Sequence, residues 1–229
     1  MRCVITIFAA ALLGSFSSAA AQAPPAWTGF YLGANIGTGW GSVDVRDTNG
    51  GVTPGPFSYN NTAWIGGLQA GYNHQLGPFV AGVEIDGGYM GLDGDGRIPS
   101  STPPNYQRIW VDGGLYAMAT GRLGFAIMQN TLIYGKGGFA WFDGEAGQKT
   151  TKPGYQTSMA DGFRGAVFGG GVEYMMASHL SFKVEYLHMD LGSVTGYQLS
   201  ISDPPIGFKY FNTHDFAIDT VRGGLNYKF

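Results

Sequence analysis

The most restrictive feature of this sequence is an alternation of apolar residues with glycine or polar residues, repeated in eight segments. In WTGFYLGANIGTGWG, one face carries Phe30 and Leu32 while the other carries Gly33 and Asn35. A period of two is typical of a β-strand whose two faces meet different surroundings. The segments are 27–41, 62–75, 79–90, 111–127, 131–142, 165–176, 180–190 and 220–229. We therefore predict an all-β chain of eight strands.

The connections between these segments alternate in length. Three are the tripeptides LGP, MQN and MAS, which predict tight turns. The other four run to roughly twenty residues and are rich in Gly, Pro, Ser and Thr, as in GDGRIPSSTPPNYQ. Short turns alternating with long loops are typical of bacterial outer-membrane barrels. In the segment that begins at Val111, the alternation places Val111 on the apolar face. Trp110 would then fall on the polar face, so we expect it in a loop.

Composition separates a membrane barrel from a soluble one. The chain has 39 glycines and 14% aromatic residues, but only 13% charged residues. In a lipocalin-like barrel or a β-sandwich, the polar faces would meet water, and glycine with few charges makes a poor solvent surface. Those faces suit the crowded interior of a narrow barrel, with the apolar faces toward lipid. We predict an eight-stranded antiparallel up-and-down transmembrane β-barrel.

The first residues have the order of a secretory signal peptide. Arg2 precedes a short apolar run, and small residues with A-x-A sites follow. We expect a signal peptide over 1–21, with cleavage after 23 as the alternative, and the barrel over 24–229. The only cysteine, Cys3, lies in the leader. Loss of Arg2 changes the formal net charge from −3 to −4, and without a basic stripe we expect no nucleic-acid partner.

Charged residues on the predicted inward faces fall at similar distances from the short turns. Four are acidic and four are basic, namely Glu84, Asp86, Arg122, Lys136, Glu173, Lys183, Glu185 and Arg222. Eight strands enclose a lumen only just wide enough for side chains. We therefore favour a polar plug that determines the register of the strands. The alternative is a charged constriction in an open channel.

Aromatic residues lie near the ends of the predicted strands on the apolar face. One ring would comprise Trp40, Trp64, Tyr89 and Trp141, and the other Tyr72, Phe79, Phe125 and Tyr174. Tryptophan and tyrosine concentrate at both interfaces of a membrane. The two sets predict an aromatic girdle.

Three stretches resemble the alphaproteobacterial outer-membrane proteins of the porin family, which are related to the OmpA-like barrel: WTGFYLGANIGTGWG, GGVEYMMASHLSFKVEYLHMDLG and the closing VRGGLNYKF. The resemblance implies the cell outer membrane, lipid as a partner, and a structural envelope role with limited passage of small solutes. It also implies that the last strand is the signal read by the barrel-assembly machinery, through Val221, Leu225, Tyr227 and Phe229. Some members are adhesins or haem binders, so a binder that uses its surface loops is the alternative.

Other candidate sites are weaker. His188 with Asp190 would suit a hydrolase, but no serine motif accompanies the pair, and we expect no enzyme and no catalytic residues. The sequence from Asp93 to Gly96 begins like a calcium loop, yet Arg97 takes a ligand position and the closing Glu is absent. We therefore expect no metal and no cofactor. An unknown ligand would meet tyrosines that we expect on the loops: Tyr59, Tyr106, Tyr155, Tyr197 and Tyr210.

Overall fold

The computed structural model describes residues 27–47, 55–99, 106–150, 155–157, 159–200 and 209–229. The predicted signal peptide lies outside this part of the chain. The strands are β1 (Gly29–Asp47), β2 (Gly55–Leu76), β3 (Phe79–Pro99), β4 (Tyr106–Met128), β5 (Thr131–Thr150), β6 (Tyr155–Thr157), β7 (Met159–Ala177), β8 (Leu180–Ser200) and β9 (Lys209–Lys228). Within the described ranges, no helix is long and apolar enough to span a membrane.

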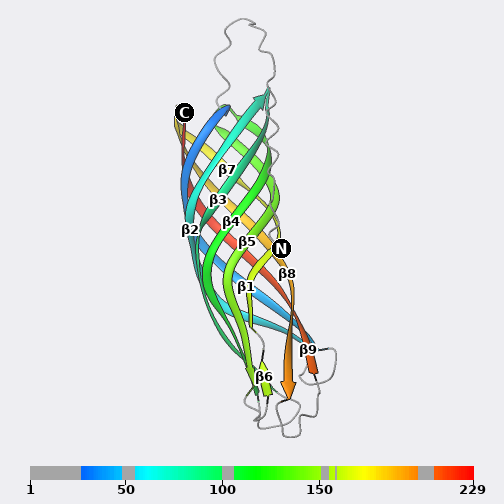
Figure 1. The fold of residues 1–229 in the computed structure, drawn as a ribbon. Coiled ribbons are helices and arrows are strands. Elements are labelled where there is room, and N and C mark those ends of the chain that lie inside the picture. The colour runs from blue at the N-terminus through cyan, green and yellow to red at the C-terminus, as the bar shows by residue number, and fades with distance from the viewer. Residues whose placement is uncertain (1–26, 48–54, 100–105, 151–154, 158, 201–208) are drawn as a thin grey trace, which may run out of the picture.

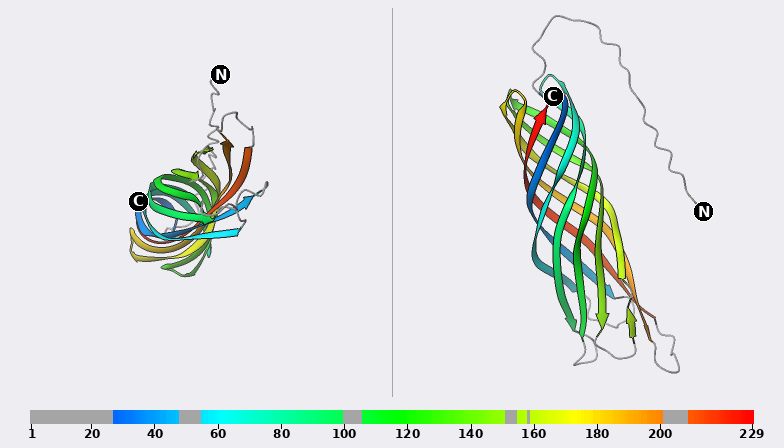
Figure 2. Two further views of the ribbon diagram at one scale, coloured as in Figure 1. Left: turned by 90° about the horizontal axis from the view of Figure 1, so that it is seen from below. Right: turned by 60° about the vertical axis from the view of Figure 1, so that its left-hand side comes forward.

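Eight long strands close into one antiparallel barrel. Neighbours pair in chain order from β1 to β5, then β5 with β7, β7 with β8, and β8 with β9. The last strand also pairs with the first, from Tyr31 opposite Lys228 to Asp47 opposite Asn212, which closes the sheet. The three-residue β6 adds only to the far end of β8. The predicted eight-stranded antiparallel barrel is confirmed, and its strands wind steeply around one axis (Figures 1 and 2).

Three tight connections lie at one end of the barrel, which we call the turn end. They join β2 to β3, β4 to β5 and β7 to β8. Gly77 has a φ of 60° in the first of them, a conformation that glycine adopts without steric cost. The backbone N–H of Phe229 donates to the carbonyl of Phe30, so the last residue lies at this end too (Figure 1). We call the opposite end, where β6 lies, the loop end.

The strands run much farther toward the loop end than the alternation predicted. The β3–β4 ladder continues to Pro99 opposite Tyr106, and the β4–β5 ladder to Gln107 opposite Thr150. The prediction of structureless twenty-residue loops is therefore wrong in extent. Backbone pairing continues where the side-chain pattern fades, because ladder hydrogen bonds need no apolar face. All five tyrosines expected on loops lie in strands: Tyr59, Tyr106, Tyr155, Tyr197 and Tyr210.

Trp110 and Val111 both depart from the prediction. Trp110 lies within β4, opposite Gly147 of β5, rather than in a loop. Val111 is buried in the interior rather than on the outer wall. The cause is an irregularity in the ladder between Asp112 and Leu115, which shifts the parity of the residues before it. Alternation alone does not reveal such a bulge.

The outer wall is apolar and the interior is packed. Phe139 is 78% exposed and Leu123 73%, both on the outer face. Inward glycines leave room for large polar side chains. A methyl group on Gly71 would collide with the hydroxyl of Tyr31, and one on Gly67 with that of Tyr116. Glycine on the inward face therefore lets tyrosines cross the lumen.

Candidate functional site

All eight inward charges meet in one buried layer of the barrel, which we call the charged layer: Glu84 and Asp86 from β3, Arg122 from β4, Lys136 from β5, Glu173 from β7, Lys183 and Glu185 from β8, and Arg222 from β9. Each is at most 5% exposed. Ions in such surroundings are costly unless they are paired and hydrogen-bonded. The contacts of each group therefore decide whether the layer is a plug or a path.

Two glutamates and two lysines form the centre of the charged layer. Lys136 Nζ lies 2.6 Å from Glu84 Oε1 and 3.1 Å from Glu185 Oε1. Lys183 Nζ lies 3.3 Å from Glu84 Oε2 and 3.3 Å from Glu185 Oε1. Each lysine thus bridges both carboxylates, and the four charges neutralise one another across three strands.

An arginine pairs with a further acid on each side of this centre. Arg122 Nη2 lies 2.6 Å from Glu173 Oε2, and its Nη1 lies 3.8 Å from Glu84. Arg222 Nη2 lies 2.7 Å from Asp86 Oδ2 and 2.9 Å from Glu185 Oε2. Every charge in the layer therefore has an opposite charge from another strand within 4 Å, and Lys183 and Glu185 also pair within β8.

Neutral residues complete the charged layer, and the sequence prediction did not include them. The hydroxyl of Tyr31 donates to Glu84 at 2.7 Å, and that of Tyr134 to Glu185 at 2.9 Å. The guanidinium of Arg122 lies over the ring of Tyr134, 4.2 Å from its centroid. Further donors to the acids are Asn35 to Asp86 at 3.2 Å, and Ser181 and Asn226 to Glu173 at 2.5 and 2.8 Å. The position of these neutral residues on the inward faces of their strands was the sequence signal that could have identified them.

Apolar side chains fill the lumen between the charged layer and the loop end. On β8 the inward residues change from Lys183 and Glu185 to Leu187 and Met189, which are 0% and 1% exposed. They belong to a cluster that we call the loop-end seal: Ala63, Ile65, Met90, Val111, Tyr116, Met118, Ala140, Phe142, Phe163, Val167, Leu187, Met189, Leu191 and Ile218. Alternation with polar or glycine residues on the inward faces did not predict this apolar layer.

A smaller apolar cluster closes the turn end. Trp27, Val80, Leu132 and Tyr134 pack together there, and we call them the turn-end seal. The backbone N–H of Trp27, just before β1, donates to the side chain of Gln75 at 3.1 Å. The charged layer therefore lies between two apolar plugs. Apolar constrictions resist the entry of water and ions.

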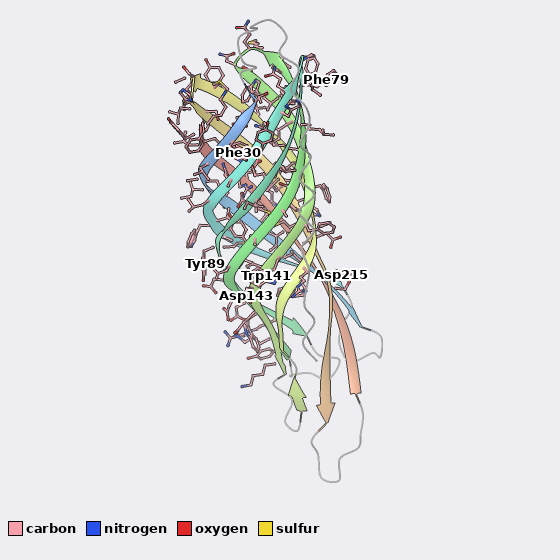
Figure 3. The ribbon with its side chains drawn as sticks, turned by 45° about the horizontal axis from the view of Figure 1, so that its top comes forward. Phe30, Phe79, Tyr89, Trp141, Asp143 and Asp215 are labelled. Carbon is pink, nitrogen blue, oxygen red and sulfur yellow. The ribbon has the colours of Figure 1, made fainter. Side chains whose placement is uncertain are left out.

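The predicted girdle residues all lie on the outer wall. Near the loop end, the rings of Trp64 and Tyr89 lie 5.5 Å apart, with Trp40 and Trp141 on other strands. Near the turn end, Phe79 and Phe125 make an edge contact at 5.4 Å, and Tyr72 and Tyr174 also face outward. Figure 3 shows Phe79 near the turn end, with Tyr89 and Trp141 well separated from it along the barrel.

The four predicted assembly residues also face outward. Val221, Leu225, Tyr227 and Phe229 form a row on β9, and Phe229 is 68% exposed. The rings of Tyr227 and Phe229 make an edge contact at 5.3 Å.

His188 does not pair with Asp190 as the hydrolase hypothesis required. Its Nδ1 lies 2.8 Å from Asp219 Oδ1, and Tyr186 donates to the same oxygen at 2.5 Å. Asp190 instead accepts from the backbone of Gly192. In the part of the chain that the structure describes, no serine bonds His188, and no group of His, Cys, Asp or Glu side chains is placed to hold a metal ion.

Known proteins share sequence similarity with this chain. A family model described as "Outer membrane protein beta-barrel domain" matches residues 8–229. The 31 kDa outer-membrane immunogenic protein of Brucella melitensis is 28% identical over 215 residues, which cover 89% of this chain and 84% of that protein. The 22 kDa outer membrane protein of Rhizobium leguminosarum is 31% identical over 168 residues, covering 73% and 65%.

Among solved structures, the outer membrane protein OprG from Pseudomonas aeruginosa aligns with a TM-score of 0.47 at 14% identity, covering 88% of this chain and 97% of that one. The resemblance seen in the sequence is confirmed by the family match and by the two named relatives. The chain belongs to the outer membrane protein beta-barrel domain family and is a β-barrel protein of the bacterial outer membrane.

Proposed function

We propose that this protein supports the outer membrane as a structural barrel whose interior is closed to ions in the conformation described above. The observation that carries the proposal is the layering of the lumen. A fully paired set of charges lies between the loop-end seal and the turn-end seal. An ion crossing the barrel would have to enter an apolar layer and then compete with ion pairs as short as 2.6 Å. Limited passage of small solutes would need a rearrangement of both the apolar seals and the ion pairs.

Single-channel recording tests the closed interior. The refolded protein is placed in a planar bilayer, with conductance and ion selectivity measured at low voltage. We expect a silent bilayer for most of the recording. Stable openings with charge selectivity would contradict the proposal and would mean that the charged layer lines a path.

The outward row on β9 supports a second part of the proposal, recognition by the barrel-assembly machinery. Val221, Leu225, Tyr227 and Phe229 present an apolar row on the outer face of the strand that closes the barrel. Deletion of Phe229 should reduce the amount of protease-resistant barrel in the outer membrane. The matched control is Phe79→Ala, which removes a similarly exposed ring, 63% exposed, from another strand at the same end. Normal insertion without Phe229 would argue against the role.

We also propose that the chain has no enzymatic role and that the His188–Asp219 pair is structural. Both relatives are named as outer-membrane proteins, and the pair lies on the outer wall beside Phe168, whose ring centroid is 4.9 Å from that of His188. The test is release of fatty acids from phospholipid vesicles that contain the barrel. Release that disappears in His188→Ala would contradict this assignment.

Two further expectations depend on residues outside the described part of the chain. We propose removal of residues 1–21 on export, which amino-terminal sequencing of the protein from outer membranes tests. A start at Gln22 would support it, and a start at Met1 would contradict it. The second expectation is the alternative function, a surface-loop binder, and binding assays with haem and with host matrix proteins test for a ligand.

A further inference from the structure

The outer wall of the barrel carries an apolar groove toward the loop end. Its volume is about 1160 Å³, above the roughly 300–1,000 Å³ that most ligand sites occupy. Small residues of neighbouring strands form its floor, with Ala70 on β2, Gly87 on β3, and Ala117 and Ala119 on β4. The groove is thus a hollow in a wall that otherwise carries large side chains.

Larger side chains form the sides of the groove. Across the ladders, Ala119 lies between Ile85 and Phe139, and Ala117 lies opposite Trp141. Phe139 projects from the wall, at 78% exposed. Bulky sides around a low floor suit a flexible hydrocarbon chain lying along the wall better than a flat protein surface.

One cation lines this groove. Arg164 of β7 lies opposite Trp141 and has an exposed side chain. It shares its parity with Phe168, which faces outward. Among the residues that the structure describes, Arg164 has no hydrogen bond or ion pair. The exposed carboxylates nearest in register are those of Asp143 and Asp190, and Asp190 accepts from its own turn instead.

The charge of Arg164 indicates which kind of lipid the groove would favour. Lipid tails are as apolar as the wall, so apolar fit alone does not favour one lipid over another. An arginine favours a phosphate, with which it forms charge-assisted hydrogen bonds. Trp141 marks the depth at which aromatic rings meet lipid headgroups, and Figure 3 shows it on the wall beside Asp143. In bacterial barrels the long-loop end faces outward.

We propose that this groove binds one acyl chain of an anionic outer-leaflet membrane lipid whose phosphate headgroup is held by Arg164. The bound lipid would lie along β3 and β4, with its headgroup at β7. This site is on the outer wall and is separate from the lumen. The proposal of a lipid site therefore does not depend on whether the barrel conducts ions.

Quenching of Trp141 by brominated lipids tests the site. The other tryptophans outside the interior are replaced in a Trp40→Phe, Trp64→Phe, Trp110→Phe background, which leaves Trp141 in the groove and the buried Trp27. The barrel is reconstituted in phosphatidylcholine with a small fraction of either brominated phosphatidic acid or brominated phosphatidylcholine. A basic residue near a membrane surface predicts about fivefold enrichment of the anionic lipid at Trp141.

Matched variants separate the groove from general attraction. Arg164→Gln should bring the quenching by the two lipids to equality, whereas Arg164→Lys should keep most of the enrichment. Ala119→Phe fills the floor and should abolish the enrichment. Ala81→Phe, on the outer wall outside this groove, should leave it unchanged. Heat-modifiable migration on gels shows that each variant is folded.

Two results would overturn the proposal. One is equal enrichment in the Arg164→Gln variant and the parent protein. The other is efficient cross-linking between groove cysteines of two copies in the bilayer, which would make a second copy of the chain the occupant.

Discussion

Strand β8 passes through two interior layers that are stabilised in different ways. Its inward residues near the turn end are Lys183 and Glu185, which pair with Glu84 on β3 and with Arg222 on β9. The next two inward residues, Leu187 and Met189, pack in the loop-end seal without directional bonds. Side chains of both layers are buried in the interior of the same barrel. Within one strand, charge pairing and apolar packing therefore act at different depths of the interior.

The two layers differ in how they specify the barrel. An ion pair in the charged layer needs one register, because a shift of one residue would turn the charge to the lipid face. Apolar packing tolerates exchange among side chains of similar volume. We infer that the charged layer determines which register forms, and that the loop-end seal adds stability that is less sensitive to the identity of each residue.

Loss of a carboxylate from the charged layer should have the largest effect. Glu84→Ala leaves Lys136 with one acid and removes acceptors of Lys183 and Tyr31. Because a buried charge is left uncompensated, we expect the free energy of unfolding to fall by about 3–5 kcal/mol. Urea unfolding of the refolded barrel in lipid vesicles measures it. Glu145→Ala, an exposed acid on β5, is the control. Equal urea midpoints for Glu84→Ala and Glu145→Ala would mean that an acid of the charged layer contributes no more than an exposed acid, which would refute the distinction between the two layers.

Truncation in the loop-end seal should cost less. Leu187→Ala removes a fully buried side chain, and large-to-small changes of this kind cost about 2–5 kcal/mol. We expect a value near the lower end, because Met90, Met118 and Met189 in the same seal are flexible enough to fill part of the cavity. The same urea titration measures the change, with Leu123→Ala on the lipid face as the control. A loss larger than that of Glu84→Ala would reverse the proposed order.

Much of this architecture could be predicted from the sequence. A period of two with glycine on one face predicted eight strands, and it predicted that residues such as Glu84 and Arg122 face inward, where the structure places them. The pairing could not be predicted, since it depends on register. Arg122 on β4 lies 2.6 Å from Glu173 on β7, across the intervening β5, but 3.8 Å from Glu84 on the adjacent β3.

The loop-end seal was missed for a different physical reason. Leu187 and Met189 have the composition of lipid-facing residues, and only their parity shows that they face inward. Parity also failed at the irregularity between Asp112 and Leu115, which moved Val111 from the predicted outer wall to the interior. The ends of the strands were missed because backbone ladders continue through polar sequence.

Loss of one neutral donor should weaken the charged layer without breaking an ion pair. Tyr31→Phe removes the hydroxyl that donates to Glu84 and leaves the ring in place. A hydrogen bond to a charged group contributes about 1.5 kcal/mol at the low end, and we expect a loss of that size in the urea titration. Tyr72→Phe, on the outer wall, is the matched control. If both substitutions shift the midpoint equally, the hydroxyl of Tyr31 has no special part in the layer.

The smallest effect is expected at an ion pair beyond both layers, where β3 and β4 extend toward the loop end. Arg108 Nε lies 2.9 Å from both carboxylate oxygens of Asp95, and its Nη2 donates to Oδ2 at 2.7 Å; both side chains are exposed. These hydrogen bonds lower the pKa of Asp95 below its ordinary value of 3.8. The folded state therefore favours the ionised carboxylate, so the contribution of the pair is complete above that ordinary value and is lost as the pH falls through the lowered pKa.

Arg108→Gln should raise the pKa of Asp95 toward 3.8, as followed by NMR titration of its carboxyl carbon. Arg97→Gln should raise it less, because Arg97 acts on Asp95 only through its charge and lies over the ring of Tyr106. Neither change should move the urea midpoint measurably, since exposed pairs are screened by water and salt. An unchanged pKa in Arg108→Gln would mean that water replaces the pair in solution. A shifted urea midpoint would mean that the strand extensions contribute to the stability of the layers beneath them.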